Sequence, residues 1–193
     1  MKNASVHRGF TLIELLVSVA LFSVVMVIAL GALLSLSVAD RRAETIKSAI
    51  DNLTSGVDSM SRAIRTGYNY HCLSGGLAGV PQDCVLGGDY LTFISATGAQ
   101  VYYQLDTSSA TCGQTGTIGC IERSTDGSIW YPITSPDLVI QNNGYLFHVL
   151  GAAQGDGIQP KVIITTSGIV QISSTASTTF HLQTTVTQRI YDQ

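Results

Sequence analysis

Thirty consecutive residues, from Phe10 to Ala39, contain a single ionisable side chain, Glu14. A helix of about 20 apolar residues crosses the hydrocarbon core of a bilayer, so this run is long enough to span a membrane. Lys2 and Arg8 precede the run, with no acid among residues 1–9. A cleaved secretory signal has an apolar stretch of only about 7–15 residues, much shorter than this one. The sequence therefore predicts a membrane-spanning helix near the N-terminus.

Glu14 is the unusual residue of this run, because a charged side chain in hydrocarbon is costly. Comparable residues cost roughly 2.5–3.5 kcal/mol on insertion scales, and they are usually paired or functional. Two interpretations stay open at this point. Either the carboxylate lies shallow, at the level of the lipid headgroups, or it has a partner in an assembly.

The run Arg8-Gly9-Phe10-Thr11-Leu12-Ile13-Glu14 resembles the processing site of type IV prepilins. The resemblance covers the leader and about thirty residues beyond it. It implies that a membrane-embedded prepilin peptidase cleaves after Gly9 and methylates the new terminal residue, Phe10. It also implies that Glu14 pairs with the N-terminal ammonium of a neighbouring subunit in a filament. Such a pair of opposite charges would fix the axial register of stacked helices.

Gly31 is a departure from the major pilins, many of which carry a proline at the equivalent place. Glycine weakens a helix by about 1 kcal/mol relative to alanine, so Gly31 is compatible with a bend. A small residue that allows close helix packing in the membrane is the other interpretation. The match is therefore closer to the broader pilin and pseudopilin superfamily than to major pilins.

A second helical pattern follows the apolar run without a break. Its apolar residues recur at steps of four and three and form one face: Ile46, Ile50, Leu53, Val57, Met60 and Ile64. A stripe of this width suits a helix that lies on a sheet. We expect one helix of about 55 residues, ending at Thr66-Gly67. The predicted division of the chain is a leader (1–9), a membrane and filament helix (10–39), its amphipathic second half (40–66) and a β-rich domain (67–193).

Beyond Gly67 the pattern is typical of strands. Tyr90–Ile94 and Val101–Leu105 flank Ala96-Thr97-Gly98-Ala99 and predict a hairpin. Alternation from Phe180 to Ile190 predicts a strand with one buried face. The other expected strands are 119–123, 129–133, 145–150, 161–166 and 169–173. A long helix followed by antiparallel strands predicts an α+β fold.

The strand region also resembles the J-type minor pseudopilin of type II secretion. The shared patterns are Phe-x-x-x-x-Gly-x-x-Val-Tyr-Tyr at Phe93 to Tyr103, then Ile121-Glu122-Arg123, and Pro160-Lys161-Val162-Ile163-Ile164 before the terminal Gln188-Arg189-Ile190. These patterns concern packing rather than chemistry. They favour a minor subunit.

The four cysteines, Cys72, Cys84, Cys112 and Cys120, all follow the apolar run. An even number in an exported domain favours two disulfides, with three possible connectivities. We expect neighbours to pair, Cys72 with Cys84 and Cys112 with Cys120, because each pair closes a loop rich in Gly, Ser and Thr. Two alternatives stay open. One is a zinc site formed by His71 and these thiols. The other is that the thiols are free and buried.

No enzyme motif is present: the chain has no Walker loop, His-Glu-x-x-His, Gly-x-Ser-x-Gly or Cys-x-x-Cys. The acids of the Gly-rich loops lack the spacing of an EF-hand; they are Asp83, Asp89, Asp126 and Asp156. We expect no metal, cofactor or catalytic residue. From Gly67 onward only Arg123, Lys161 and Arg189 oppose eight acids, so we also expect no nucleic-acid partner.

The expected function is that of a non-enzymatic pilin-like subunit of a type IV pilus or a type II secretion pseudopilus. The resemblance implies as partners prepilin peptidase, other pilin or pseudopilin subunits, an inner-membrane assembly platform, and membrane lipid before assembly. It implies a single-pass protein of the bacterial inner membrane with an extracytoplasmic globular domain. The alternative is a surface adhesin or DNA-uptake pilin whose loops bind a ligand.

Overall fold

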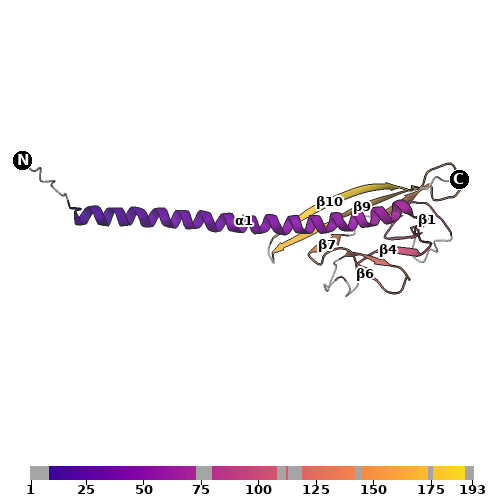
Figure 1. Cartoon of the computed structure of the whole chain (residues 1–193), viewed down its shortest axis with the longest axis horizontal. Helices are drawn as coiled ribbons and strands as arrows, with labels where there is room; N and C mark the ends of the chain where they lie inside the picture. The colour runs from indigo at the N-terminus through magenta and orange to yellow at the C-terminus, as the bar shows by residue number, and fades with distance from the viewer. Residues whose placement is uncertain are drawn as a thin grey trace, which may run out of the picture. The chain divides into compact units, whose positions relative to one another are not determined.

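In a computed structural model of the chain, α1 runs without interruption from Leu12 to Thr66, a helix of 55 residues (Figure 1). The structure describes residues 9–72, 80–107, 112, 119–141, 145–173 and 176–189. The prediction of one long helix is confirmed, and Gly31 leaves its hydrogen-bonded structure unbroken. The chain divides into two compact units, residues 1–44 and 45–193, and α1 contributes to both.

Within the first unit, the apolar side chains of α1 are exposed. Leu12, Ile28 and Leu36, for example, are 79%, 67% and 69% exposed. No described residue of 9–44 is buried. A helix that is apolar all round takes its stabilisation from surroundings that are themselves apolar, such as lipid or other helices.

Within the second unit, one face of α1 is buried. Its buried residues are Ala49, Leu53, Gly56, Val57, Met60 and Ile64. The prediction that Ile50 belongs to this face is wrong, because its side chain is 47% exposed. Ala49 and Gly56 allow the helix backbone to lie close to its neighbours, and a Cβ on Gly56 would be 3.1 Å from the Ile133 carbonyl oxygen. The buried face thus includes two small residues beside its four large ones, and Ile50 lies outside it.

Groups from beyond the helix satisfy the last carbonyls of α1. The Tyr70 hydroxyl lies 2.7 Å from the carbonyl oxygens of both Ile64 and Gly67. The Arg189 backbone N–H donates to the Arg65 carbonyl at 2.8 Å. These contacts provide partners for groups that have none within a helix. They tie the end of α1 to strand β1 (Tyr68–His71), which contains Tyr70, and to Arg189 near the end of the described chain.

The first sheet has the order β1-β3-β4-β5-β6 and is antiparallel throughout. Its strands are β1 (Tyr68–His71), β3 (Tyr90–Ile94), β4 (Gln100–Asp106), β5 (Cys120–Ser124) and β6 (Tyr131–Pro132). The predicted hairpin is confirmed: Tyr90 pairs with Gln104 and Ile94 with Gln100. Gly98 takes the positive φ of 80° that the connecting turn requires.

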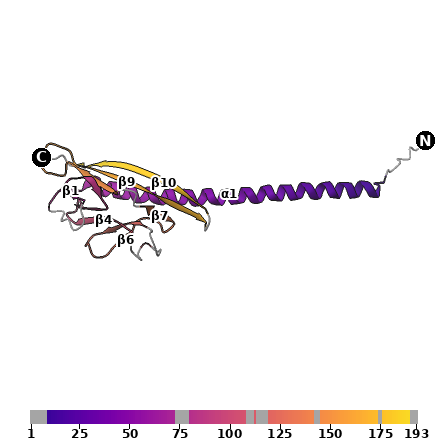
Figure 2. The ribbon, with the colours of Figure 1, turned by 180° about the vertical axis from the view of Figure 1, so that it is seen from behind.

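The second sheet has the order β10-β9-β8-β2, and β7 also pairs with β9. Its strands are β2 (Cys84–Gly88), β7 (Leu138–Gln141), β8 (Phe147–Leu150), β9 (Lys161–Ser173) and β10 (Ala176–Thr187). Figures 1 and 2 show β9 and β10 side by side, and their pairing extends from Thr187 and Lys161 at one end to Ala176 and Ser173 at the other. The alternation predicted for β10 is confirmed, but the inward face of Ala176–Thr187 is mostly half-buried, and of its residues only Val186 is buried.

Several predicted strand bounds are wrong. Residues 161–166 and 169–173 belong to the single strand β9, because Gly168 lies within the strand and not in a turn. A Cβ there would collide with the Val139 carbonyl oxygen and the Phe180 ring, so the glycine serves close packing. The strand predicted at 129–133 is reduced to Tyr131–Pro132, and β10 begins at Ala176 rather than Phe180. Its predicted end, Ile190, lies outside the described residues.

The core of the second unit joins the buried face of α1 to both sheets. The largest fully buried side chains come from all three; they include Met60, Ile64, Tyr70, Phe93, Tyr103, Phe147 and Ile164. Burying a side chain of this size contributes about 1.5–3 kcal/mol. This unit therefore has a core of its own. The architecture is α+β, as predicted, and pilin-like: one long N-terminal helix packs through its C-terminal part on antiparallel sheets.

Candidate functional site

The segment from Gly9 to Glu14 contains the start of α1. The Thr11 side-chain oxygen accepts the backbone N–H of Glu14 at 3.3 Å, and the Thr11 carbonyl accepts the N–H of Leu15 at 3.2 Å. Thr11 is therefore the N-cap, and Glu14 stands at the third helical position, where a capping box places an acid. Sequence reasoning missed the role of Thr11, although Thr-x-x-Glu before an apolar run is a recognisable capping signal.

Gly9 and Phe10 precede the helix and are accessible. No atom lies within 4 Å of the place where a Cβ of Gly9 would be, and Phe10 is 81% exposed. Glu14 is exposed in the first turn of α1, where the helix dipole favours a negative charge. The structure thus presents the three predicted processing and assembly residues together, at the accessible beginning of the helix.

Two serine side chains within the apolar part of α1 have partners in the helix itself. The hydroxyls of Ser18 and Ser23 donate to the carbonyls of Glu14 and Val19, at 2.7 and 2.8 Å. A hydroxyl paired in this way can enter an apolar environment without losing a hydrogen bond. By length and composition, α1 is a helix that can cross a membrane.

Comparison with protein families finds a match at this N-terminal segment. Residues 5–38 match the model of the prokaryotic N-terminal methylation motif. The chain fits the type IV pilin and pseudopilin superfamily. The matched residues span Gly9, Phe10, Glu14 and most of the apolar run. The comparison with curated proteins found no match, and the comparison with solved structures found none either.

The cysteines of this pilin-like chain lie in the two neighbouring pairs that we expected. Cys72 and Cys84 are paired with their Cα atoms 6.1 Å apart, and Cys112 and Cys120 with theirs 5.6 Å apart. Both separations fit a disulfide. The formation of these bonds stays a prediction, which is tested below.

His71 does not lie in a metal-binding group with the cysteines among the residues that the structure describes. Its Nδ1 is 2.8 Å from the Val80 carbonyl oxygen. The one cluster of potential ligands found in the described ranges consists of Cys112, Cys120 and Glu122. Both cysteines of this cluster are paired with each other, and Gln104 donates to Glu122 at 2.9 Å. The two cysteines, Glu122 and Gln104 thus form a largely buried polar network.

The four acids of the Gly-rich loops each accept a backbone N–H. Asp83 accepts the N–H of Ala152, Asp89 that of Leu146, and Asp156 that of Ile158, at distances of 2.6, 3.2 and 2.7 Å. Asp156 thus fixes its own loop by a local hydrogen bond, whereas Asp83 and Asp89 join segments that are 69 and 57 residues apart in the sequence.

Asp126 is the fourth of these acids and holds the turn between β5 and β6. Its Oδ1 accepts from Ile129 and Ser128. These N–H groups, in that order, and the Ser124 hydroxyl hold the pKa of the Asp126 carboxyl below its ordinary value. The carboxylate thus serves as an anchor for the turn.

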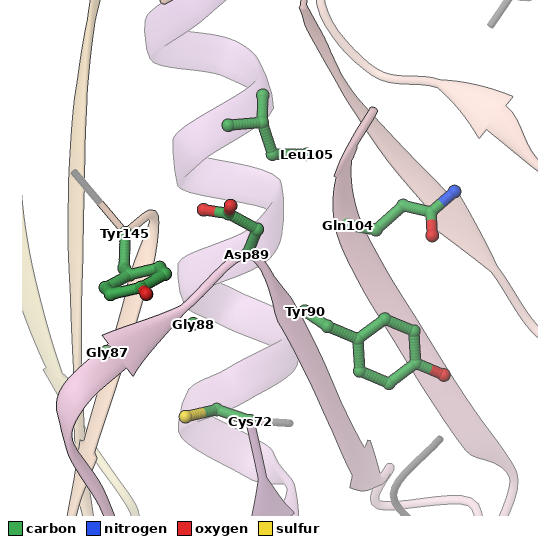
Figure 3. Close-up of a pocket in the computed structure, with 8 residues that line it drawn as sticks. All are labelled: Cys72, Gly87, Gly88, Asp89, Tyr90, Gln104, Leu105 and Tyr145. Carbon is green, nitrogen blue, oxygen red and sulfur yellow. The ribbon is translucent and has the colours of Figure 1, made fainter. Parts of the chain in front are cut away.

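A pocket of about 360 Å³ lies beside Asp89. Its lining residues are Cys72, Gly87, Gly88, Asp89, Tyr90, Gln104, Leu105 and Tyr145. Figure 3 shows Asp89 between β2 and β3, with the Tyr145 ring on one side and the Tyr90 and Gln104 side chains on the other. Burial, with a smaller effect of Tyr102, raises the pKa of Tyr90 to about 12, so its hydroxyl stays neutral near pH 7. No sequence pattern predicts this pocket, because its residues come from separate strands and loops.

Proposed function

We propose that the chain is a minor pilin or minor pseudopilin, a non-enzymatic subunit that assembles through its N-terminal helix. The observation that carries the proposal is the methylation motif at residues 5–38, placed on an accessible glycine before an apolar helix. In this proposal prepilin peptidase cleaves after Gly9 and methylates Phe10. The motif itself supports the coarser statement of a pilin-like or pseudopilin subunit processed by this peptidase.

The exposed apolar side chains of residues 12–38 support the assembly step. Before assembly they contact membrane lipid, and after it they contact the helices of other pilin or pseudopilin subunits. Glu14 then pairs with the methylated N-terminal ammonium of a neighbouring subunit. In an apolar bundle an unpaired carboxylate is penalised, so this pair sets the register of the subunits.

The proposed location is the inner membrane, with residues 67–193 on the extracytoplasmic side. The two cysteine pairs support this orientation, because disulfides persist in oxidising compartments. The assignment as a minor subunit rests on the J-type strand pattern and on Gly31 in place of the proline of many major pilins. The proposed assembly partners are other pilin-like subunits and an inner-membrane platform.

Substitution of Gly9 tests the proposal. We expect Gly9→Val to abolish cleavage in cells that contain prepilin peptidase, because a branched side chain obstructs the approach of the peptidase to the scissile bond. Mass spectrometry of the N-terminal peptide would find residues 1–9 still attached and no methyl group on Phe10. The variant would be absent from purified filaments or pseudopili.

Gly31→Val is the matched control, because neither glycine has an atom within 4 Å of its would-be Cβ. Neither substitution therefore clashes within the chain, and the control should be cleaved and methylated normally. Normal processing of Gly9→Val, or a wild-type mature chain that begins at a residue other than Phe10, would contradict the proposal.

A further inference from the structure

The last strand of the second sheet, β10, has a free edge. It pairs with β9 along its whole length and stands at one end of the strand order. In an antiparallel ladder every second residue directs its N–H and C=O away from the paired strand. Within the described ranges, no backbone group pairs with this side of β10. Such an edge is a template to which a strand of another chain can add.

The sequence of β10 lacks the features that usually protect an edge. Between Ala176 and Thr187 there is no Lys, Arg, Asp, Glu, Pro or Gly. The only irregularity in its pairing lies between Ala176 and Ser177, so the register is regular from Ser177 to Thr187. Charges, prolines and bulges are common means of preventing strand addition. β10 is instead long, regular and rich in threonine, a β-branched residue that favours strands.

The other three end strands in the described part of the two sheets carry such protection. β6 consists of two residues, one of which is Pro132. The pairing of β1 is irregular between Tyr68 and His71, and that of β2 between Cys84 and Gly88. Short length, proline and irregular register each limit pairing with a further strand. β10 is thus the end strand that the fold leaves open to a partner.

The inward side chains of β10 are incompletely covered. All of them except Val186 are half-buried. Phe180 and Leu182 pack against the core of the second unit but are not enclosed by it. Because side chains on adjacent strands contact one another, a strand on the free side would bring its own side chains beside Phe180 and Leu182. Burial of apolar surface would then add to the new backbone hydrogen bonds.

The side chains of β10 also restrict the chemistry of the partner. Its inward positions carry no acidic or basic side chain. A charged residue of the partner that faced inward would therefore be buried without an opposite charge, which is costly. The edge thus favours an uncharged segment with apolar residues at every second position.

A second copy of this chain fits the edge less well than a different subunit. Figures 1 and 2 show β10 running along the part of α1 that belongs to the second unit. Two copies paired antiparallel through β10 would therefore have these parts of α1 pointing in opposite directions. Subunits anchored by the N-terminal part of α1 in one membrane point the same way, so this pairing does not suit them. An extended segment of a different subunit has no such restriction.

We propose that the free edge of β10 is an assembly surface, to which an uncharged extended segment of another pilin-like subunit adds as a strand. Backbone hydrogen bonds along the edge hold the segment, and its apolar side chains cover Phe180 and Leu182. The inference rests on the proposed function, because the partner is a pilin-like subunit. It adds a second contact to the one made by the N-terminal helix.

Amide hydrogen exchange tests whether the edge is free before assembly. The full chain in detergent micelles would be measured residue by residue by NMR. We expect fast and slow amides to alternate from Ser177 to Thr187, with the outward amides exchanging at least about tenfold faster than those paired with β9. A uniformly slow segment would show that the edge is already covered, and a uniformly fast one that β10 is not held by β9. Either result would overturn the proposal.

A cross-link in the cells that make the protein tests the partner. A photoreactive amino acid would replace Gln183, an exposed residue of β10, in the full chain. Thr165 is the matched control, because it is also exposed and pairs with Gln183 from β9, one strand or about 4.8 Å further from the edge. We expect Gln183 to give several-fold more adduct, with an uncharged, alternating segment of another pilin-like subunit. Equal yields from both positions, no adduct, or an adduct with a second copy would contradict strand addition by this partner.

Two lysine variants, one residue apart, show whether the added chain is a strand. Thr178 faces inward and is half-buried, whereas Thr179 is exposed. An inward charge at an edge opposes strand addition. Thr178→Lys should therefore reduce the Gln183 adduct several-fold, and Thr179→Lys should leave it unchanged. Equal adducts from the two variants would refute the proposal.

The alternating amide exchange of β10 in micelles checks that each variant is folded. Should Thr178→Lys lose this pattern, the inward and outward positions Thr184 and Thr185 provide the same comparison. Mass spectrometry of the N-terminal peptide separates this proposal from the proposed function. If only the edge proposal fails, the mature chain still begins at Phe10 and the adducts do not follow the predicted pattern. If the proposed function fails, residues 1–9 remain attached in the wild-type chain.

Discussion

The two parts of α1 differ in what covers their apolar side chains, and the part richer in apolar residues is the one that this chain leaves uncovered. In residues 12–44 the apolar side chains are exposed, whereas in residues 45–66 one face is buried against strands of the same chain. The first part therefore depends on lipid or other subunits, and the second belongs to a unit with its own core. A single helix thus serves two environments. The difference teaches that apolar content alone does not show whether a side chain stabilises the fold or an assembly.

The strongest test of this comparison uses the same substitution in both parts. Met60 is 1% exposed and Met26 is 46% exposed. We expect Met60→Ala to lower the free energy of unfolding by about 2–5 kcal/mol, because it leaves a cavity in the core. Met26→Ala should change it by less than about 0.5 kcal/mol. Denaturant unfolding of the full chain in micelles, followed by fluorescence of Trp130, the single tryptophan, gives both values. Similar losses for the two variants would contradict the division.

The cysteine pairs offer a second test, because they occur only in the second unit. In the chain-entropy model, a disulfide with the sequence separation of 12 found for Cys72 and Cys84 contributes about 3 kcal/mol. We expect Cys72→Ser with Cys84→Ser to lower the free energy of unfolding by about this amount, while the helical circular dichroism of the micelle-bound chain is retained.

Peptide mapping without reductant checks the connectivity and provides the control. It should find Cys72 linked to Cys84 and Cys112 to Cys120. Crossed pairs or free thiols in protein exported by its own cell would contradict the pairing.

A third test separates two roles at the start of α1. Thr11→Ala removes the cap of the Glu14 N–H and should cost about 0.5–2 kcal/mol, seen as faster amide exchange at residues 14 and 15. Glu14→Gln keeps a residue that suits the third position of a capping box but removes the charge. We expect it to form the helix normally and to enter filaments poorly. If Glu14→Gln assembles as well as wild type, charge pairing of Glu14 is not needed.

The features that could be predicted from the sequence are those that depend on local patterns of apolar and polar residues. The apolar run and the stripe from Leu53 to Ile64 sufficed to predict α1, and the alternation on either side of Gly98 predicted the hairpin of β3 and β4. The methylation motif is likewise contiguous, so the candidate processing site was accessible to sequence reasoning. Each of these patterns depends on neighbours within a few residues.

The features that sequence missed depend on contacts between distant segments. Ala49 is buried and Ile50 is exposed, and Gly56 lies close to the Ile133 carbonyl, a close approach that residue hydrophobicity does not encode. From sequence, Gly168 suggests a turn. In the structure it lies within β9, because a Cβ there would collide with the Phe180 ring. The irregular pairing of β2 with β8 between Cys84 and Gly88 is visible only in the structure. The pocket beside Asp89 combines residues that no short motif unites.

The smallest expected effect concerns Asp126, an acid that contrasts with Glu14. Its hydrogen-bond donors come from its own turn, whereas the proposed partner of the Glu14 charge comes from another subunit.

Because the pKa of Asp126 is lowered in the folded chain, the contribution of its carboxylate to stability is present above the unfolded pKa. That contribution is lost as the pH falls through the folded pKa. NMR titration should find its midpoint below that of an ordinary aspartate. Asp126→Asn keeps the acceptor oxygen but does not titrate, so the stability difference from wild type should shrink as the pH falls. A difference that does not depend on pH would show that the charge of Asp126 adds nothing to the turn, and that an amide holds it equally well.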